Sequence, residues 1–180
     1  MERFLIEYCA ETLAALKMAN LFSYSYQTVE RLNQEILKVN ELIRETKITI
    51  ECLKVGRKRA LIYVYRKEGV QKTLKEMRVS QFLSYFGYQV FTIDDCITYL
   101  KERLNSCTDF PHEIGIFLDY PIEDVIGFIE HQGKDYKGRG YWKVYDHVAE
   151  TLQRFEQFTS CREFYLQQYK EGLSLQDLIL

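Results

Sequence analysis

Apolar residues recur at helical spacing in several segments of the chain. In residues 4–16, for example, Leu5, Cys9 and Leu13 follow one another at steps of four. The same reasoning predicts helices over residues 28–44, 70–86 (as two short helices), 92–104, 121–131 and 146–170. The last of these is the longest, and we expect Gly172 to stop it.

Four other segments have the composition of β-strands. Residues 47–52 alternate polar and apolar side chains, and residues 61–65 are rich in β-branched and aromatic ones, so the two predict a β-hairpin. The continuous apolar run 114–118 predicts a strand buried on both faces, with Phe117 facing away from Ile114, Ile116 and Leu118. Residues 141–145 predict a fourth strand.

Together these elements predict an α+β fold. We expect a single globular domain over residues 1–180, with about four strands in one mixed or antiparallel sheet, packed helices and a long C-terminal helix. The chain has 180 residues, of which 47% are hydrophobic, enough to build a core of its own. No repeat or linker-like composition interrupts it.

The charge balance and the cysteine content limit which binding partners and which cellular compartment we expect. Because 24 basic and 26 acidic residues give a net charge of −2, we expect no nucleic-acid binding. The N-terminus lacks the basic start of a signal peptide, and no apolar run approaches the ~18 residues of a membrane span. We therefore expect a cytoplasmic protein without membrane contact. The five cysteines include no C-x-x-C pair, which predicts free thiols and no metal site.

His112 and Glu113 are the pair most typical of an enzyme. A histidine can act as a general base near neutral pH, and a carboxylate can orient it. Neighbouring residues of a strand point to opposite faces, so the two share a site only if the strand begins after them. The alternative is that they satisfy backbone groups at the start of the strand.

A basic, glycine-rich loop is the second candidate. Lys134, Arg139 and Lys143 lie close to three glycines, whose backbone N–H groups can approach an anion. Tyr141 is a further candidate contact, because tyrosine is a common binding anchor. The loop matches neither a phosphate-binding P-loop nor a dinucleotide fingerprint, so no cofactor is implied. The alternative is a solvated connection.

Two segments resemble a family of bacterial proteins of unknown function, found mostly in anaerobes. They are residues 110–129, FPHEIGIFLDYPIEDVIGFI, and residues 140–145, GYWKVY. The similarity extends more loosely to the N-terminal segment and to residues 61–66. The family carries no established activity, so the resemblance implies none. Its members usually have glycine at the position of Asp119, and some have cysteines in the loop 134–139. These departures argue against catalysis by Asp119 and against a metal or redox role for the loop.

Two functional hypotheses follow. The one we favour is a non-catalytic binding or regulatory module, whose ligand is unknown and could be a small anionic molecule or a protein. The alternative is a small enzyme acting on an anionic metabolite, with His112 as base, Glu113 as its orienting group, and Lys134, Arg139 and Lys143 as anion contacts. Whether the protein is an enzyme stays open at this point. The enzyme hypothesis requires His112 and the basic loop to meet at one pocket.

Overall fold

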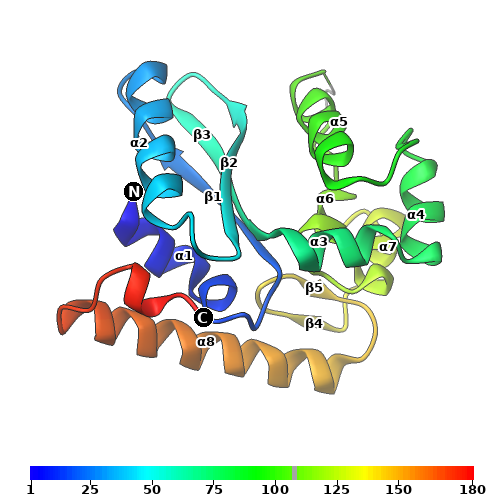
Figure 1. Ribbon diagram of the computed structural model, residues 1–180. Coiled ribbons are helices and arrows are strands. Elements are labelled where there is room, and N and C mark those ends of the chain that lie inside the picture. Colours follow the sequence, from blue (N-terminus) through cyan, green and yellow to red (C-terminus); the bar gives the residue numbers. More distant parts are fainter. Residues whose placement is uncertain (107–108) are drawn as a thin grey trace.

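A three-stranded antiparallel sheet with the order β1-β3-β2 organises the fold in the computed structural model, which describes residues 1–106 and 109–180 (Figure 1). Its strands are β1 (Ala19–Ser25), β2 (Ile48–Val55) and β3 (Arg59–Arg66). A separate antiparallel pair, the β4–β5 hairpin, consists of β4 (Gly138–Arg139) and β5 (Lys143–Val144). The helices are α1 (Glu2–Leu13), α2 (Val29–Leu42), α3 (Lys67–Leu74), α4 (Met77–Ser84), α5 (Ile93–Ser106), α6 (Ile114–Phe117), α7 (Ile122–Glu130) and α8 (Val148–Lys170), followed by the 3-10 turn η1 (Gln176–Leu178). The described residues thus form an α+β fold with a long C-terminal helix, as predicted.

The central strand β3 is buried along most of its length, because helices cover both faces of the sheet. Ile62 and Val64 pack in an apolar cluster with residues of α1 and α2. Tyr63 and Tyr65 lie on the opposite face, in a second cluster with residues of α3, α5 and α6, and their rings stack 4.7 Å apart. The predicted hairpin of β2 and β3 is confirmed.

The prediction of about four strands in one sheet is wrong. The strand β1, which pairs with β3, was not predicted. Its apolar alternation is broken by Asn20, a buried polar residue whose side-chain oxygen lies 2.5 Å from the hydroxyl of Thr12 in α1. A polar residue on the buried face is tolerated when it is hydrogen-bonded, and the partner from α1 is invisible in the local pattern.

Residues 114–118 form the short helix α6 and its end, so the prediction of a strand here, with side chains on two sheet faces, is also wrong. The N–H groups of Ile114, Gly115 and Ile116 donate to carbonyl oxygens three residues earlier, at 3.2, 3.2 and 3.0 Å. The predicted burial is correct, and Phe117 is fully buried. A short apolar run has no periodicity that separates a buried strand from a buried helical turn.

The segment 141–145 is a strand only in part, and it does not join the central sheet. Lys143 and Val144 form β5, which pairs with β4. Trp142 and Val144 pack with Phe155 and Phe158 of α8 in a third apolar cluster. This cluster fixes the β4–β5 hairpin to α8.

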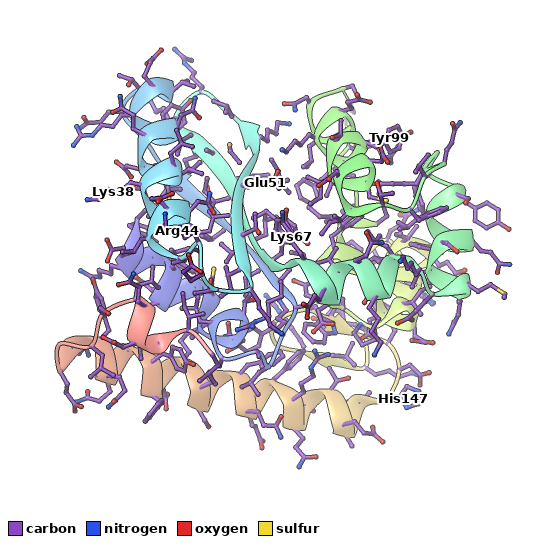
Figure 2. The ribbon with its side chains drawn as sticks, viewed as in Figure 1. Lys38, Arg44, Glu51, Lys67, Tyr99 and His147 are labelled. Atoms are coloured by element: carbon purple, nitrogen blue, oxygen red, sulfur yellow. The ribbon has the colours of Figure 1, made fainter. Side chains whose placement is uncertain are left out.

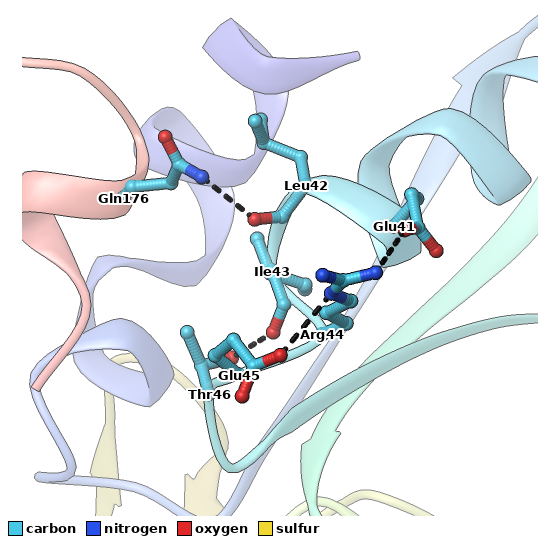
Figure 3. A network of polar contacts seen from close by, with 7 residues as sticks. All are labelled: Glu41, Leu42, Ile43, Arg44, Glu45, Thr46 and Gln176. Atoms are coloured by element: carbon cyan, nitrogen blue, oxygen red, sulfur yellow. Dashed lines mark hydrogen bonds and ion pairs between the residues drawn. The ribbon is translucent and has the colours of Figure 1, made fainter.

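The helix α8 runs beneath both the central sheet and the β4–β5 hairpin in the view of Figure 1. It packs mainly on α1, and its Tyr165 joins the cluster between α1, α2 and the sheet. After α8 the chain turns back, and Gln176 donates to the carbonyl of Leu42 at the end of α2, at 2.8 Å (Figure 3). The N–H of Leu180 donates to the carbonyl of Leu13 at 3.1 Å. The terminal segment is therefore docked.

Glu51 of β2 is a half-buried carboxylate on the side of the sheet that faces α5 (Figure 2). Burial works to raise the pKa of its carboxyl, but hydrogen bonds from Lys101 at 2.6 Å and from the Tyr65 hydroxyl at 2.5 Å outweigh it. The pKa of Glu51 therefore lies below its ordinary value. A depressed carboxyl pKa stabilises the folded state above the pKa of the unfolded chain.

Replacement of Glu51 by glutamine is expected to lower the free energy of unfolding at pH 7. That deficit should shrink as pH falls below about 4.3, the ordinary pKa of a glutamate, because the wild-type carboxylate then becomes protonated too. Urea titrations over a series of pH values measure it. Glu68→Gln, at a side chain that is 80% exposed and pairs with Lys47, serves as the control. A deficit that grows with acid contradicts the expectation.

Candidate functional site

A cavity of about 330 Å³ lies between α6, α7 and the β4–β5 hairpin, and we call it the α6–hairpin cavity. Most of its wall is apolar, and the residues of this kind are Phe110, Ile114, Leu118, Val125, Phe128 and Trp142. Its volume lies within the range of small-molecule sites, about 300–1,000 Å³. Its wall comes from residues 110–128, which include α6 and the first part of α7, and from residues 139–143 of the hairpin.

Asp124, in the first turn of α7, holds the hairpin side of this cavity in place. Its buried carboxylate accepts hydrogen bonds from Trp142 Nε1 at 2.7 Å, from Tyr145 N at 2.7 Å and from Asp146 N at 3.2 Å. Three donors satisfy a carboxylate that would otherwise be costly to bury. They also fix the segment after β5 to the start of α7.

Aromatic contacts form the inner wall. The ring of Trp142 stacks on Tyr120 with centroids 4.6 Å apart and meets Phe155 of α8 edge-on at 4.5 Å. The hairpin approaches α8 closely at Gly140, where a Cβ would collide with the Phe155 ring. The indole therefore sits in a fixed position between the cavity and α8.

Four of the residues singled out from sequence line the α6–hairpin cavity together: His112, Arg139, Tyr141 and Lys143. His112 is exposed, and its ring packs against Phe128 of α7 at 4.8 Å. Arg139 is also exposed, and no described residue forms an ion pair or hydrogen bond with its guanidinium. The structure thus brings the predicted base and part of the basic loop to one cavity.

Lys143 and Tyr141 are engaged within the protein. The ammonium of Lys143 donates to the carbonyl of Gly133 at 2.6 Å and lies 5.1 Å from the centre of the Tyr136 ring. The Tyr141 ring lies 5.0 Å from the Arg162 guanidinium, and burial raises the pKa of the phenol. Arg139 is therefore the cation with the freest access to a ligand.

Lys134 and Glu113 do not line the α6–hairpin cavity. Lys134 is exposed on the loop before the hairpin. Glu113 is buried and pairs with Arg103 of α5. His112 and Glu113 do border a neighbouring cavity of about 470 Å³, but no hydrogen bond joins the two residues. Glu113 thus satisfies Arg103 rather than His112.

A protein-family model matches residues 5–179, almost the whole chain. The chain belongs to the DUF3793 family of proteins of unknown function. The expected resemblance to a family without an assigned activity is confirmed at that level. For this DUF3793 protein, no curated protein and no solved structure gives a match.

Asp119 links three parts of the DUF3793 fold. It follows α6 with a φ of 64°, in the left-handed region that favours glycine. Its carboxylate pairs with Arg154 of α8 and accepts a hydrogen bond from the N–H of Met18, just before β1, at 3.3 Å. Neither the pairing of Asp119 nor that of Asp124 has a signal in the local sequence, because the partners lie in other elements.

Within residues 1–106 and 109–180, no three His, Cys, Asp or Glu side chains are grouped to hold a metal ion. No helix in these ranges combines the length and the apolar content needed to cross a bilayer. Cys9, Cys52, Cys96 and Cys161 are free thiols, whereas Cys107 lies outside the described residues.

Proposed function

We propose that this protein is a binding module for a small molecule with an apolar body and one anionic group, held in the α6–hairpin cavity. The observation that carries the proposal is the guanidinium of Arg139, unpaired among the described residues, at a mostly apolar cavity. An arginine that no described residue neutralises can pair with a carboxylate through two parallel hydrogen bonds. The aromatic wall around Trp142 suits the apolar body.

The charges of the cavity favour an anion over a cation. His112, Arg139 and Lys143 are the basic side chains of its wall, and Asp124 is the acidic one. The Asp124 carboxylate already accepts three hydrogen bonds from Trp142, Tyr145 and Asp146, which use most of its acceptor sites. An incoming cation would meet three basic groups and one largely occupied carboxylate, whereas an incoming carboxylate finds Arg139.

The contacts of His112 favour binding over catalysis. A histidine base is usually held in one orientation by a hydrogen bond to a carboxylate. Glu113 pairs with Arg103 instead, and no described residue forms a hydrogen bond with the His112 ring. The convergence of His112 and Arg139 suits the enzyme hypothesis, but the orienting group that it assigned to Glu113 is engaged elsewhere.

Replacement of Arg139 by glutamine is expected to weaken the binding of apolar monoanions about tenfold or more, since a charged hydrogen bond contributes roughly 1.5–3 kcal/mol. Isothermal titration calorimetry with 4-phenylbutyrate, octanoate and cinnamate, each beside its uncharged amide, measures the effect. Lys134→Gln is the matched control, because Lys134 is a basic residue of the same loop outside the cavity.

Three outcomes contradict the proposal. The first is that the wild-type protein binds none of the three acids. The second is that the amides bind as tightly as the acids. The third is that Lys134→Gln weakens binding as much as Arg139→Gln. Because Trp142 is the only tryptophan in the sequence and lines the cavity, a change in its fluorescence places a bound acid there.

A further inference from the structure

A second cavity, of about 320 Å³, lies where four segments of the chain meet, and we call it the Lys17 cavity. Its charged lining residues are Lys17, Lys47, Arg66, Glu68 and Asp119. Lys17 lies between α1 and β1, Arg66 ends β3, and Asp119 follows α6. It shares no lining residue with the α6–hairpin cavity.

Lys17 is buried, and its ammonium has no hydrogen-bond or ion-pair partner among the described residues. Only 4% of its surface is exposed. The nitrogen lies 5.2 Å from the centre of the Tyr120 ring. A lysine is almost never fully buried unless it is paired, so this position needs an explanation.

The charged groups around Lys17 do not supply the missing partner. Glu11 of α1 pairs with Arg162 of α8 at 2.8 Å through Oε1, and its Oε2 is buried without a hydrogen bond. Asp119 pairs with Arg154 of α8. Burial lowers the pKa of Lys17 to about 8. Glu11, Asp119 and Cys9 act against this shift, and Arg154 adds to it. About a tenth of the amine is therefore unprotonated at pH 7, far more than in an ordinary lysine, and the unprotonated amine is a nucleophile.

Cations also line the cavity around this amine. The Arg66 guanidinium donates to the carbonyls of Thr12 at 2.7 Å, Leu13 at 2.8 Å and Leu180 at 2.6 Å, which fixes its position. Lys47 has a side chain that is 69% exposed and pairs with Glu68 at 3.4 Å. A small molecule in the cavity would meet the amine of Lys17 and positive charge from Arg66 and Lys47.

We propose that Lys17 is a nucleophilic amine that binds small 2-oxo acids as a Schiff base, with their carboxylate facing Arg66 and Lys47. The nitrogen lone pair attacks the carbonyl carbon and forms a C–N bond. The carbonyl oxygen then leaves as water, carrying the two amine hydrogens, and a C=N double bond remains. No oxidant or reductant takes part in this step.

Reductive trapping tests the proposal. The folded protein is incubated at pH 7 with glyoxylate and cyanoborohydride, which reduces the C=N bond to a stable secondary amine, and peptide mass spectrometry locates the label. At this pH the unprotonated fraction of Lys17 exceeds that of an ordinary lysine, with a pKa near 10.4, by more than about 100-fold. Lys17 should therefore be labelled before the exposed Lys134. Labelling of exposed lysines while Lys17 stays unmodified overturns the proposal.

A second comparison tests the carboxylate contact. Lys47→Gln should reduce the labelling of Lys17 by glyoxylate severalfold and leave its labelling by the uncharged glycolaldehyde unchanged. Lys75→Gln, at an exposed lysine outside the cavity, is the matched control. Equal loss of labelling with both aldehydes in Lys47→Gln overturns the assignment of a 2-oxo acid. Because mass spectrometry locates the label at Lys17, the outcome of this labelling test does not depend on whether an anion binds at Arg139.

Discussion

Replacement of Phe117 by alanine is expected to lower the free energy of unfolding by about 3–5 kcal/mol, the usual cost of deleting a buried phenylalanine ring. Phe117 is fully buried in α6, and its ring lies 5.8 Å from that of Tyr88. Its carbonyl accepts a hydrogen bond from the Tyr63 hydroxyl at 2.7 Å, which joins α6 to the central sheet. Urea denaturation followed by far-ultraviolet circular dichroism measures the loss.

Phe164 provides the matched control for this substitution. It lies on α8 with 58% of its surface exposed, so Phe164→Ala should change the free energy of unfolding by no more than about 0.5 kcal/mol. A similar loss in both variants would show that ring burial in α6 does not decide the stability. A loss below about 1 kcal/mol for Phe117→Ala would contradict the placement of α6 in the core.

Replacement of Asp124 by asparagine is expected to cost roughly 3 kcal/mol, because the amide leaves a buried donor facing another donor. Asparagine keeps one acceptor oxygen, whereas the carboxylate of Asp124 serves the indole of Trp142 with one oxygen and the N–H groups of Tyr145 and Asp146 with the other. Release of the hairpin should expose Trp142 to water and shift its fluorescence emission to longer wavelength. Chemical denaturation and emission spectra measure the two effects.

Asp135→Asn is the control that distinguishes loss of the Asp124 hydrogen bonds from the general effect of removing one negative charge. Asp135 precedes the β4–β5 hairpin and has a side chain that is 80% exposed. We expect Asp135→Asn to unfold within about 0.5 kcal/mol of the wild-type protein and to keep its emission spectrum. An unchanged spectrum in Asp124→Asn would show that the indole does not depend on this carboxylate.

Helices with a regular apolar stripe could be predicted from the sequence. The helix α2 (Val29–Leu42) begins after Thr28, whose hydroxyl accepts a hydrogen bond from the N–H of Arg31 at 3.2 Å, as expected of an N-cap. An apolar stripe depends only on the spacing of residues within one segment, so the sequence of that segment is enough to reveal it. The long helix α8 was found for the same reason.

Elements whose burial depends on distant partners could not be predicted. The run 114–118 is apolar on all sides both as a buried strand and as a buried helical turn, and its contact with Tyr63 of β3 is not visible locally. The same holds for β1, where the buried Asn20 depends on Thr12 of α1. In each case the deciding interaction joins segments far apart in the sequence.

The candidate site was found in part for similar reasons. The enzyme hypothesis required His112 and the basic loop to meet at one pocket, and Arg139 and Lys143 of that loop do line a cavity together with His112. The sequence did not reveal that Glu113 forms an ion pair with Arg103 of α5, or that Asp124 accepts a hydrogen bond from Trp142 of the hairpin. Lys17 carried no motif at all, since its isolation results from the pairing of Glu11 and Asp119 with arginines of α8.

The packing of α1 against α8 also sets the order in which this chain can fold during synthesis. The cluster that covers one face of the central sheet combines Leu5 of α1 with Tyr165 of α8 and Leu178 of η1. On a ribosome α1, α2 and the sheet are made long before α8, so the part of this cluster that α8 and η1 complete stays exposed to water until those elements emerge. Contacts between such distant segments slow folding. Until α8 emerges, the nascent protein therefore carries an apolar surface suited to chaperone binding.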